Sequence, residues 1–317
     1  PELRQAIADF YHKHYKYIAD PNSEILPLMG SKEGIMHISM AFLNPGDKAL
    51  IPNPGYPTYQ SVTRLVEAEP VFYDLKAEHQ WQPDLEALDQ MDLTNVKLMW
   101  VNYPHMPTGA NVQKDTFEKL IAWAKEKDIL LVNDNPYSFV LTDQPQSLMS
   151  VPGAQEVGME LNSLSKSFNM AGWRVGMVLG NKENINAVLK VKSNMDSGMF
   201  YGIQQGAIAA LQAQESWFKN LNDIYRKRRK LIFELASLLN TDFDPHSSGL
   251  FVWAKMRETS KSSVEYIEEI LQNHHIFIAP GSIFGRVYRV IFKMVIELCY
   301  KGFIYCFKRY VITCKLL

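Results

Sequence analysis

The strongest constraint on the fold of this chain is an alternation of short apolar runs with amphipathic helical stretches. This alternation is typical of a mostly parallel sheet, because a helix after each strand returns the chain to the same end of the sheet. We therefore predict an α/β fold whose large domain has three layers, α/β/α. The expected strands are residues 49–52, 70–73, 97–102, 129–133, 158–163 and 175–179, and the expected helices are residues 32–43, 56–66, 114–127 and 182–193.

The pattern changes in the second part of the chain. A long helical region at 201–239 is followed by an apolar run at 250–255, a helical pattern at 262–273 and a second run at 276–280. These elements predict a smaller, incomplete α+β domain. The expected division is an N-terminal helix (1–20), a large domain (21–205), a small C-terminal domain (206–285) and an atypical basic, apolar tail (286–317).

Composition narrows the classes of function. The 317 residues carry 33 Lys and Arg against 34 Asp and Glu, so the net charge of −1 gives no argument for a nucleic-acid or membrane partner. The basic run at 225–230 is interpreted as a solvated helix face, because no second basic stripe accompanies it. Three cysteines without a Cys-x-x-Cys pair exclude a disulfide scaffold and a zinc finger and favour a cytoplasmic location. His12, His14, His274 and His275 are interpreted as surface residues, because no carboxylate or cysteine accompanies them at ligand spacing, and no metal is expected.

Both ends of the chain differ from its body. All three cysteines lie beyond Gly285, and residues 286–317 contain seven basic side chains and one acidic side chain. We predict that this tail comes from an altered reading frame or a damaged gene end; an amphipathic, membrane-surface tail is the competing interpretation. At the other end, residues 1–4 open directly into a helical pattern, and we expect that an N-terminal segment is missing.

Three polar segments carry residues suited to catalysis. One loop contains Lys166 and Arg174, the residue types of an amine nucleophile and a phosphate-binding guanidinium. Asp134 follows an expected strand, at the edge where α/β folds bind ligands. Residues 30–34 open a helix whose free N–H groups form an anion site. Taken alone, the lysine loop is also consistent with an ordinary polar loop, and residues 30–34 with a plain helix cap.

Together these segments resemble a known family. Gly30-Ser-Lys-Glu-Gly34, Asn53-Pro-Gly-Tyr-Pro-Thr-Tyr59, Asn102-Tyr-Pro-His-Met-Pro-Thr-Gly109, Asp134-Asn-Pro-Tyr137 and residues 163–176 look like the ordered motifs of class I/II aminotransferases. These are fold type I enzymes that depend on pyridoxal 5′-phosphate (PLP). The resemblance covers roughly residues 1–285 and is closest to the branch of LL-diaminopimelate, aspartate and alanine aminotransferases. It implies that the large domain binds PLP.

The resemblance also implies a role for each matching residue. Lys166 corresponds to the lysine that forms a Schiff base with the cofactor and then moves the α-proton of the substrate. Asp134 would pair with the pyridine nitrogen and keep it protonated. Tyr137 would hydrogen-bond the phenolic oxygen, and Tyr56 would stack on the ring. The implied phosphate ligands are Ser31, Lys32, Ser163 and Arg174.

One position departs from the pattern of the family. Where the family has the asparagine of Asn-Pro-Thr-Gly, this chain has Met106, which cannot donate a hydrogen bond. Either Asn102 or His105 would take the place of the missing asparagine, although both also fit ordinary loop positions. We include Asn102 among the expected cofactor contacts. The loss of one hydrogen bond costs about 0.5–1.5 kcal/mol, so Met106 should tune cofactor binding rather than abolish it. Neither Arg289 nor Lys293 fits the family's carboxylate-binding arginine, which stays unassigned.

The resemblance implies PLP-dependent transamination, in which an amino group moves from an L-amino acid to a 2-oxo acid by a ping-pong mechanism. Two alternatives stay open. One is a PLP-dependent C–S β-lyase, which shares the cofactor site but eliminates a thiol; the other is a truncated cofactor-binding remnant without turnover. Family members are usually homodimers, so a homodimer is expected. Neither nucleic acid nor a membrane is an expected partner of the body of the chain.

Overall fold

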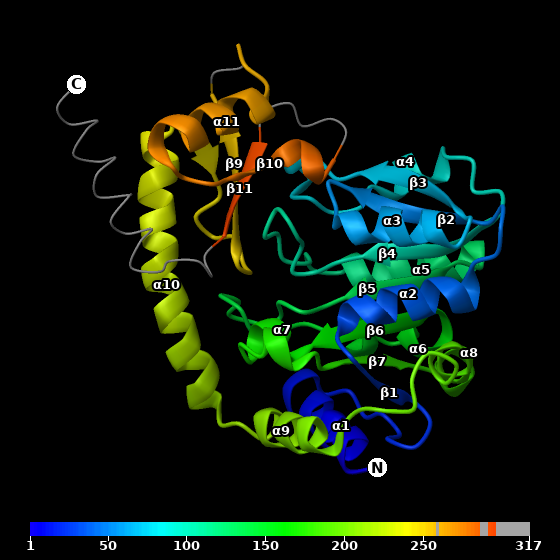
Figure 1. Ribbon diagram of the computed structural model, residues 1–317. Coiled ribbons are helices and arrows are strands. Elements are labelled where there is room, and N and C mark those ends of the chain that lie inside the picture. Colours follow the sequence, from blue (N-terminus) through cyan, green and yellow to red (C-terminus); the bar gives the residue numbers. More distant parts are fainter. Residues whose placement is uncertain (258–259, 286–290, 296–317) are drawn as a thin grey trace.

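The computed structural model describes residues 1–257, 260–285 and 291–295. Its centre is a sheet with the strand order β1-β7-β6-β5-β4-β2-β3 (Figure 1). Five neighbouring strands, β6, β5, β4, β2 and β3, are parallel to one another. Strand β7 is antiparallel to β6, and β1 is antiparallel to β7, so the sheet is mostly parallel, as predicted. The strands are β1 (Ile25–Leu28), β2 (Lys48–Asn53), β3 (Glu69–Asp74), β4 (Val96–Val101), β5 (Leu130–Asp134), β6 (Gly158–Ser163) and β7 (Gly176–Gly180).

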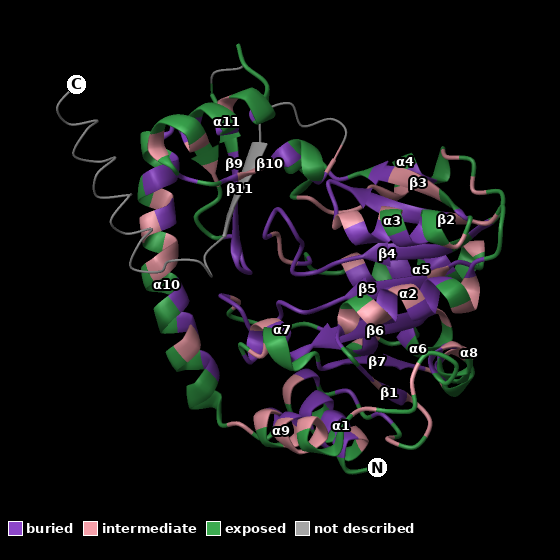
Figure 2. Cartoon of the chain, in the orientation of Figure 1, coloured by how far each residue is buried: buried purple, intermediate pink, exposed green. Residues whose placement is uncertain are grey.

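Helices cover both faces of this sheet, which confirms the three-layer α/β/α architecture. Side chains alternate along β4, so Trp100 packs with α2, α3 and α8, whereas Met99 packs with α4 and α5 on the opposite face. Helices α1 and α9 pack against β1 and β7. Figure 2 shows the strands buried between these layers. The helices are α1 (Glu2–Tyr15), α2 (Ser31–Phe42), α3 (Pro57–Leu65), α4 (Leu85–Asp89), α5 (Thr116–Lys127), α6 (Ala154–Val157), α7 (Leu164–Ser167), α8 (Lys182–Lys192) and α9 (Tyr201–Leu211).

A second, antiparallel sheet has the strand order β10-β11-β9-β8. Leu235 of α10, Ile267 of α11 and Val252 of β9 share a buried cluster with Met106 and Tyr137, which lie in loops of the first sheet. The two sheets therefore meet through one apolar core. The elements are α10 (Glu215–Leu238), β8 (Thr241–Phe243), β9 (Phe251–Met256), α11 (Ser263–His274), β10 (Ala279–Pro280) and β11 (Ile291–Val295). The domain limits given above stay a prediction.

The sequence prediction did not include the short elements α4, α6, α7 and β8, and three further differences concern longer segments or the edge of the sheet. Strand β1 was missed, because it is four residues long and includes Pro27. The helical region at 201–239 consists of two helices, α9 and α10, and no glycine or proline marks the break between them. The strand expected at 276–280 is reduced to the two residues of β10.

Two expectations fall on the C-terminal part of the chain. Arg286, Arg289 and the tail beyond Val295 lie outside the described residues. Lys293 belongs to β11, where its backbone pairs with that of Trp253 in β9. Within the residues that the structure describes, no helix is long and apolar enough to cross a membrane.

Candidate active site

The first part of the site is a cradle of backbone around Gly176. Gly176 pairs with Leu28 of β1 and with Ser163 of β6, so three strand ends meet there. A Cβ atom on Gly176 would lie 2.7 Å from the backbone nitrogen of Ser31, the first residue of α2. Only glycine permits this approach. The sheet thereby holds the N-terminus of α2, whose N–H groups are a ready anion site, beside Ser163.

A guanidinium closes this cradle. Arg174 has a left-handed backbone conformation, with φ of 53°, and its Nη1 donates to the carbonyl of Ala171 at 2.9 Å. Its guanidinium lies so close to Gly30 that a Cβ atom there would collide with Nη2. The structure therefore brings Arg174, Ser163 and Ser31 together around one small space. Lys32, the other predicted phosphate ligand, is an exposed residue of the first turn of α2.

A network of charged side chains fastens the first turn of α2 to α8. Glu33 pairs with His37 at 3.0 Å and with the Lys192 ammonium at 3.2 Å, and Lys192 also pairs with Asp196. Burial opposes ionisation of Glu33, but hydrogen bonds from His37 and the Met29 N–H, with the charge of Lys192, lower its pKa to about 2. Glu33, His37 and Asp196 have the side-chain types of a metal site, yet the Lys192 ammonium already lies among them.

The second part of the site is a buried carboxylate at the end of β5. Asp134 is 4% exposed, and its Oδ2 accepts a hydrogen bond from the Tyr59 hydroxyl at 2.9 Å. Its Oδ1 is buried and has no hydrogen-bond partner among the described residues. Burial raises the pKa of Asp134 to about 7. Because an unpartnered buried oxygen is costly, this atom identifies a place where a protonated ring nitrogen would fit.

Tyr59 contacts Asp134, and two further tyrosines, Tyr56 and Tyr137, lie near Tyr59. Tyr59 stacks on Trp100, with ring centroids 5.0 Å apart, and this packing holds its hydroxyl on Asp134. Tyr56 meets Tyr59 edge-on at 5.6 Å. Tyr137 is buried and meets Phe251 of the second sheet edge-on at 5.5 Å. Sequence reasoning identified Tyr56 and Tyr137 but missed Tyr59, although it ends the same Asn53–Tyr59 motif.

The loop that contains Met106 is tied to the end of β5 by Asn102. The Asn102 Oδ1 accepts from the backbone N–H of Met106 at 2.7 Å, and its Nδ2 donates to the carbonyl of Asp134. His105 bonds Thr108 at 2.7 Å, and burial lowers its pKa to about 3, so its ring is neutral. Asn102 thus holds the methionine loop in place, and its contact with the cofactor stays a prediction.

Lys166 lies in α7, immediately after β6. The Ser163 hydroxyl caps this short helix by accepting from the N–H of Ser165 at 3.1 Å. One residue after the lysine, the Ser167 hydroxyl donates to the carbonyl of Pro136 at 3.3 Å, which fastens α7 to the loop between Asp134 and Tyr137. The lysine is therefore carried between the two predicted halves of the site, the cradle and the buried carboxylate.

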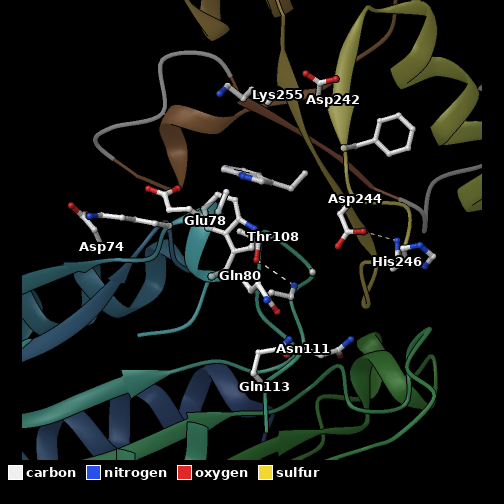
Figure 3. A pocket seen from close by; sticks show the side chains of 17 residues that line it. Asp74, Glu78, Gln80, Thr108, Asn111, Gln113, Asp242, Asp244, His246 and Lys255 are labelled. Atoms are coloured by element: carbon white, nitrogen blue, oxygen red, sulfur yellow. Dashed lines mark hydrogen bonds between the residues drawn. The ribbon is translucent and has the colours of Figure 1, made fainter. Parts of the chain in front are cut away.

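A large cavity lies elsewhere, between the two sheets. Its volume is about 830 Å³, and it is lined by loops that follow β3 and β4 and by the second sheet (Figure 3). Asp74 and Glu78 face it from the first side and Asp244 from the other. Thr108 of the methionine loop lines this cavity, but neither Lys166 nor Asp134 does.

The sequence matches the family model "Aminotransferase class I and II" over residues 1–294. The chain belongs to this family. The match runs a few residues past Gly285, close to the expected limit of the resemblance. This aminotransferase is 38% identical over 287 residues to LL-diaminopimelate aminotransferase of Aquifex aeolicus, covering 90% of this chain and 74% of the relative. It is 39% identical, with the same coverage, to LL-diaminopimelate aminotransferase of Halothermothrix orenii.

Solved structures give the same family. The apo-BacF structure from Bacillus subtilis matches this aminotransferase with a TM-score of 0.92 and 35% identity, covering 97% of this chain and 82% of that one. A probable N-succinyldiaminopimelate aminotransferase from Thermus thermophilus matches with a TM-score of 0.89 and 28% identity, covering 97% and 83%. The activity of this aminotransferase is therefore transamination, and neither alternative, β-lyase or inactive remnant, is better supported.

Proposed function

We propose that this aminotransferase uses pyridoxal 5′-phosphate, with the phosphate at the Gly176 cradle and the pyridine nitrogen on Asp134. The observation that carries the proposal is the buried Oδ1 of Asp134, which lacks a partner among the described residues while its Oδ2 is held by Tyr59. A pyridinium N–H supplies the missing donor. Ser31, Lys32, Ser163 and Arg174 would hold the phosphate dianion through backbone N–H groups, a hydroxyl and a guanidinium.

Each side chain of the site then has a defined task. When bound, the cofactor supplies an electron sink for the carbanion left as the substrate α-proton departs. Asp134, ionised once it faces a cation, keeps the ring nitrogen protonated. Tyr137 donates to the phenolic oxygen, and Tyr56 covers the ring. The Lys166 amine would hold the cofactor and would carry the α-proton of the substrate as a general acid and base.

The substrates would be an L-amino acid and a 2-oxo acid, exchanged by a ping-pong mechanism. Relatives at 36–39% identity are named LL-diaminopimelate aminotransferase, which makes LL-diaminopimelate the first donor to test. The proposed location is the cytoplasm, consistent with a body in which no cysteine occurs before Gly285.

We further propose that the enzyme is a homodimer. Large apolar side chains are exposed beside the cradle and at the start of α9: Trp173 is 47% exposed, Phe200 74% and Tyr201 64%. Trp173 directly precedes Arg174, and its ring packs against Gly206 of α9. A second copy of the chain would cover these side chains. Sedimentation equilibrium with Phe200→Glu tests this: a wild-type monomer would reject the dimer.

The decisive experiment is a titration of the purified chain with pyridoxal 5′-phosphate. We expect an absorbance band that survives dialysis in the wild type and in the control Lys182→Ala, whose lysine begins α8, but not in Lys166→Ala. Turnover of Lys166→Ala should fall by about 1,000-fold or more. No band at saturating cofactor would reject the proposal.

Turnover assays separate the alternatives. A β-lyase releases pyruvate and thiol from cystathionine without a 2-oxo acid, whereas a transaminase requires that acceptor. A band without turnover for any donor would identify a binding remnant.

A further inference from the structure

A second buried carboxylate lies behind Asp134. Glu160 on β6 is 0% exposed, and in the sheet it pairs with Asn133, the residue that precedes Asp134. Isolated charges are very costly to bury, so a buried glutamate persists only where its surroundings satisfy it. None of the proposed steps uses this side chain, and its contacts show what it does.

Five hydrogen bonds from the described residues converge on the two oxygens of Glu160. Its Oε1 accepts from the Tyr11 hydroxyl at 3.0 Å, the Asn135 amide at 3.2 Å and the Ser147 hydroxyl at 2.8 Å. Its Oε2 accepts from the Asn133 amide at 3.0 Å and the Leu148 N–H at 2.8 Å. Each partner is placed as a donor, which is the arrangement that an ionised carboxylate requires.

Neighbouring bonds fix most of these donors. The Asn133 Oδ1 already accepts from the N–H of Tyr103 at 3.1 Å, so its amide N–H₂ must face Glu160. The Ser147 hydroxyl oxygen accepts from Met149 at 3.1 Å, which directs its proton to the carboxylate. Burial raises the pKa of Glu160, and the bonds from Asn133, Ser147 and Leu148 oppose that effect. We therefore take the ionised form as the one this network holds.

The network reaches the cofactor residues from two sides. Asn133 and Asn135 flank Asp134, so Glu160 grips both neighbours of the carboxylate that would meet the pyridine nitrogen. Tyr11 of α1 also accepts from the Asn162 amide at 3.0 Å. Burial is the main cause of the raised pKa of Asp134, and the charge of Glu160 adds to it.

We propose that Glu160 is a positioning residue for the cofactor: its hydrogen bonds fix both residues beside Asp134, and its charge adds a second buried negative charge behind the ring. This inference rests on the proposed use of pyridoxal 5′-phosphate. The second charge favours every protonated, cationic form of the bound cofactor. Asp134 alone would hold the ring nitrogen less firmly.

The other titratable groups that face Glu160 do not supply this charge. Tyr11 and Tyr15 of α1 have pKa values raised by burial, and burial also raises the pKa of Tyr17, to about 12. All three are neutral at neutral pH. Asp134 is the remaining acid. A change of Glu160→Gln therefore removes one negative charge, leaves the three tyrosines neutral and takes away the contribution of Glu160 to the raised pKa of Asp134.

The test uses the full chain as Glu160→Gln, with Glu156→Gln as the matched control. Glu156 is an exposed glutamate of α6 paired with Lys125. Three quantities are measured: the pyridoxal 5′-phosphate dissociation constant, the pH at which the bound cofactor changes absorbance, and the unfolding temperature without cofactor. In Glu160→Gln we expect the dissociation constant to rise about tenfold and the absorbance midpoint to fall by about half a pH unit or more. The control should match the wild type.

The outcomes separate the possible failures. If Glu160→Gln unfolds at a lower temperature but keeps the wild-type absorbance midpoint, Glu160 is merely structural and the inference is rejected. If the wild type itself binds no cofactor, the proposed function fails first. Should Glu160→Gln not fold, Tyr11→Phe decides: it removes one donor and keeps the ring. It should shift the midpoint in the same direction by a smaller amount, and an unchanged midpoint and affinity overturn the inference.

Discussion

The substitution Asp134→Asn should make the cofactor-free enzyme relatively more stable as pH rises. Burial raises the pKa of Asp134 to about 7, from an ordinary value of 3.8. Below pH 4 the carboxyl is protonated in the folded and unfolded states alike, so it costs nothing. Between these two values the unfolded chain ionises first, and stability falls with each unit of pH. Above pH 7 the cost is complete.

The magnitude follows from the same two values. One pKa unit corresponds to about 1.36 kcal/mol, so the difference between about 7 and 3.8 amounts to about 4 kcal/mol at full ionisation. Between pH 5 and pH 8 the change is about 2 to 3 kcal/mol. Asparagine removes this dependence, and its Oδ1 can still accept from the Tyr59 hydroxyl. Its amide N–H₂ adds an unsatisfied donor, which is a cost that does not vary with pH.

Thermal unfolding of both cofactor-free proteins at several pH values measures the effect. The unfolding temperature of Asp134→Asn relative to the wild type should rise by about 4 to 6 °C from pH 5 to pH 8. Taking the difference between the two proteins cancels the titration of all groups that do not interact with Asp134. With pyridoxal 5′-phosphate added, the order should reverse, because the wild-type carboxylate gains a cationic partner and binds about 10- to 100-fold more tightly. A relative stability that does not change with pH would refute the reasoning.

Two further substitutions examine the cradle and the methionine loop. Gly176→Ala places a Cβ atom 2.7 Å from the Ser31 nitrogen, so the dissociation constant of pyridoxal 5′-phosphate should rise about tenfold. The control Gly172→Ala, whose Cβ atom would have no neighbour within 4 Å, should leave this constant unchanged. Equal effects of the two substitutions would contradict the proposed cradle. Met106→Asn restores an amide donor and should lower the KM for the 2-oxo acid about 2- to 10-fold. An unchanged or higher KM, measured by steady-state kinetics, would show that the amide does not reach the substrate.

The sequence predicted the residues that lie within continuous motifs. Asp134 ends β5 and Lys166 follows the parallel strand β6, and the ends of such strands carry ligand sites, so their meeting could be anticipated. Hydrogen-bond partners that are brought together by the order of the strands could not be predicted in this way. Tyr59 lies 75 positions from Asp134, and Tyr11 lies 149 positions from Glu160. Only the order of the strands and the packing of α1 bring these pairs together.

Local pattern also failed where an element is too short to show a period. Strand β1 has four residues, and its place at the edge of the sheet is set by pairing with β7 rather than by its own sequence. The role of Glu160 could not be predicted for a related reason. A single acidic residue inside an apolar run interrupts the strand pattern, and the local sequence does not show which residues it contacts.

The charged network on α2 has a consequence for how this enzyme tolerates change. Glu33 places a negative charge in the helix turn that would receive a phosphate dianion, and Lys192, from another helix, compensates for it. Lys192 therefore offsets the negative charge of Glu33 at the anion site, although it is not one of the proposed phosphate ligands. Loss of Lys192 alone would leave Glu33 and its other acidic partner, Asp196, uncompensated beside the phosphate, so relatives that lose this lysine should also have lost Glu33 or Asp196. Paired variation at two positions 159 residues apart would then record the presence of an anion.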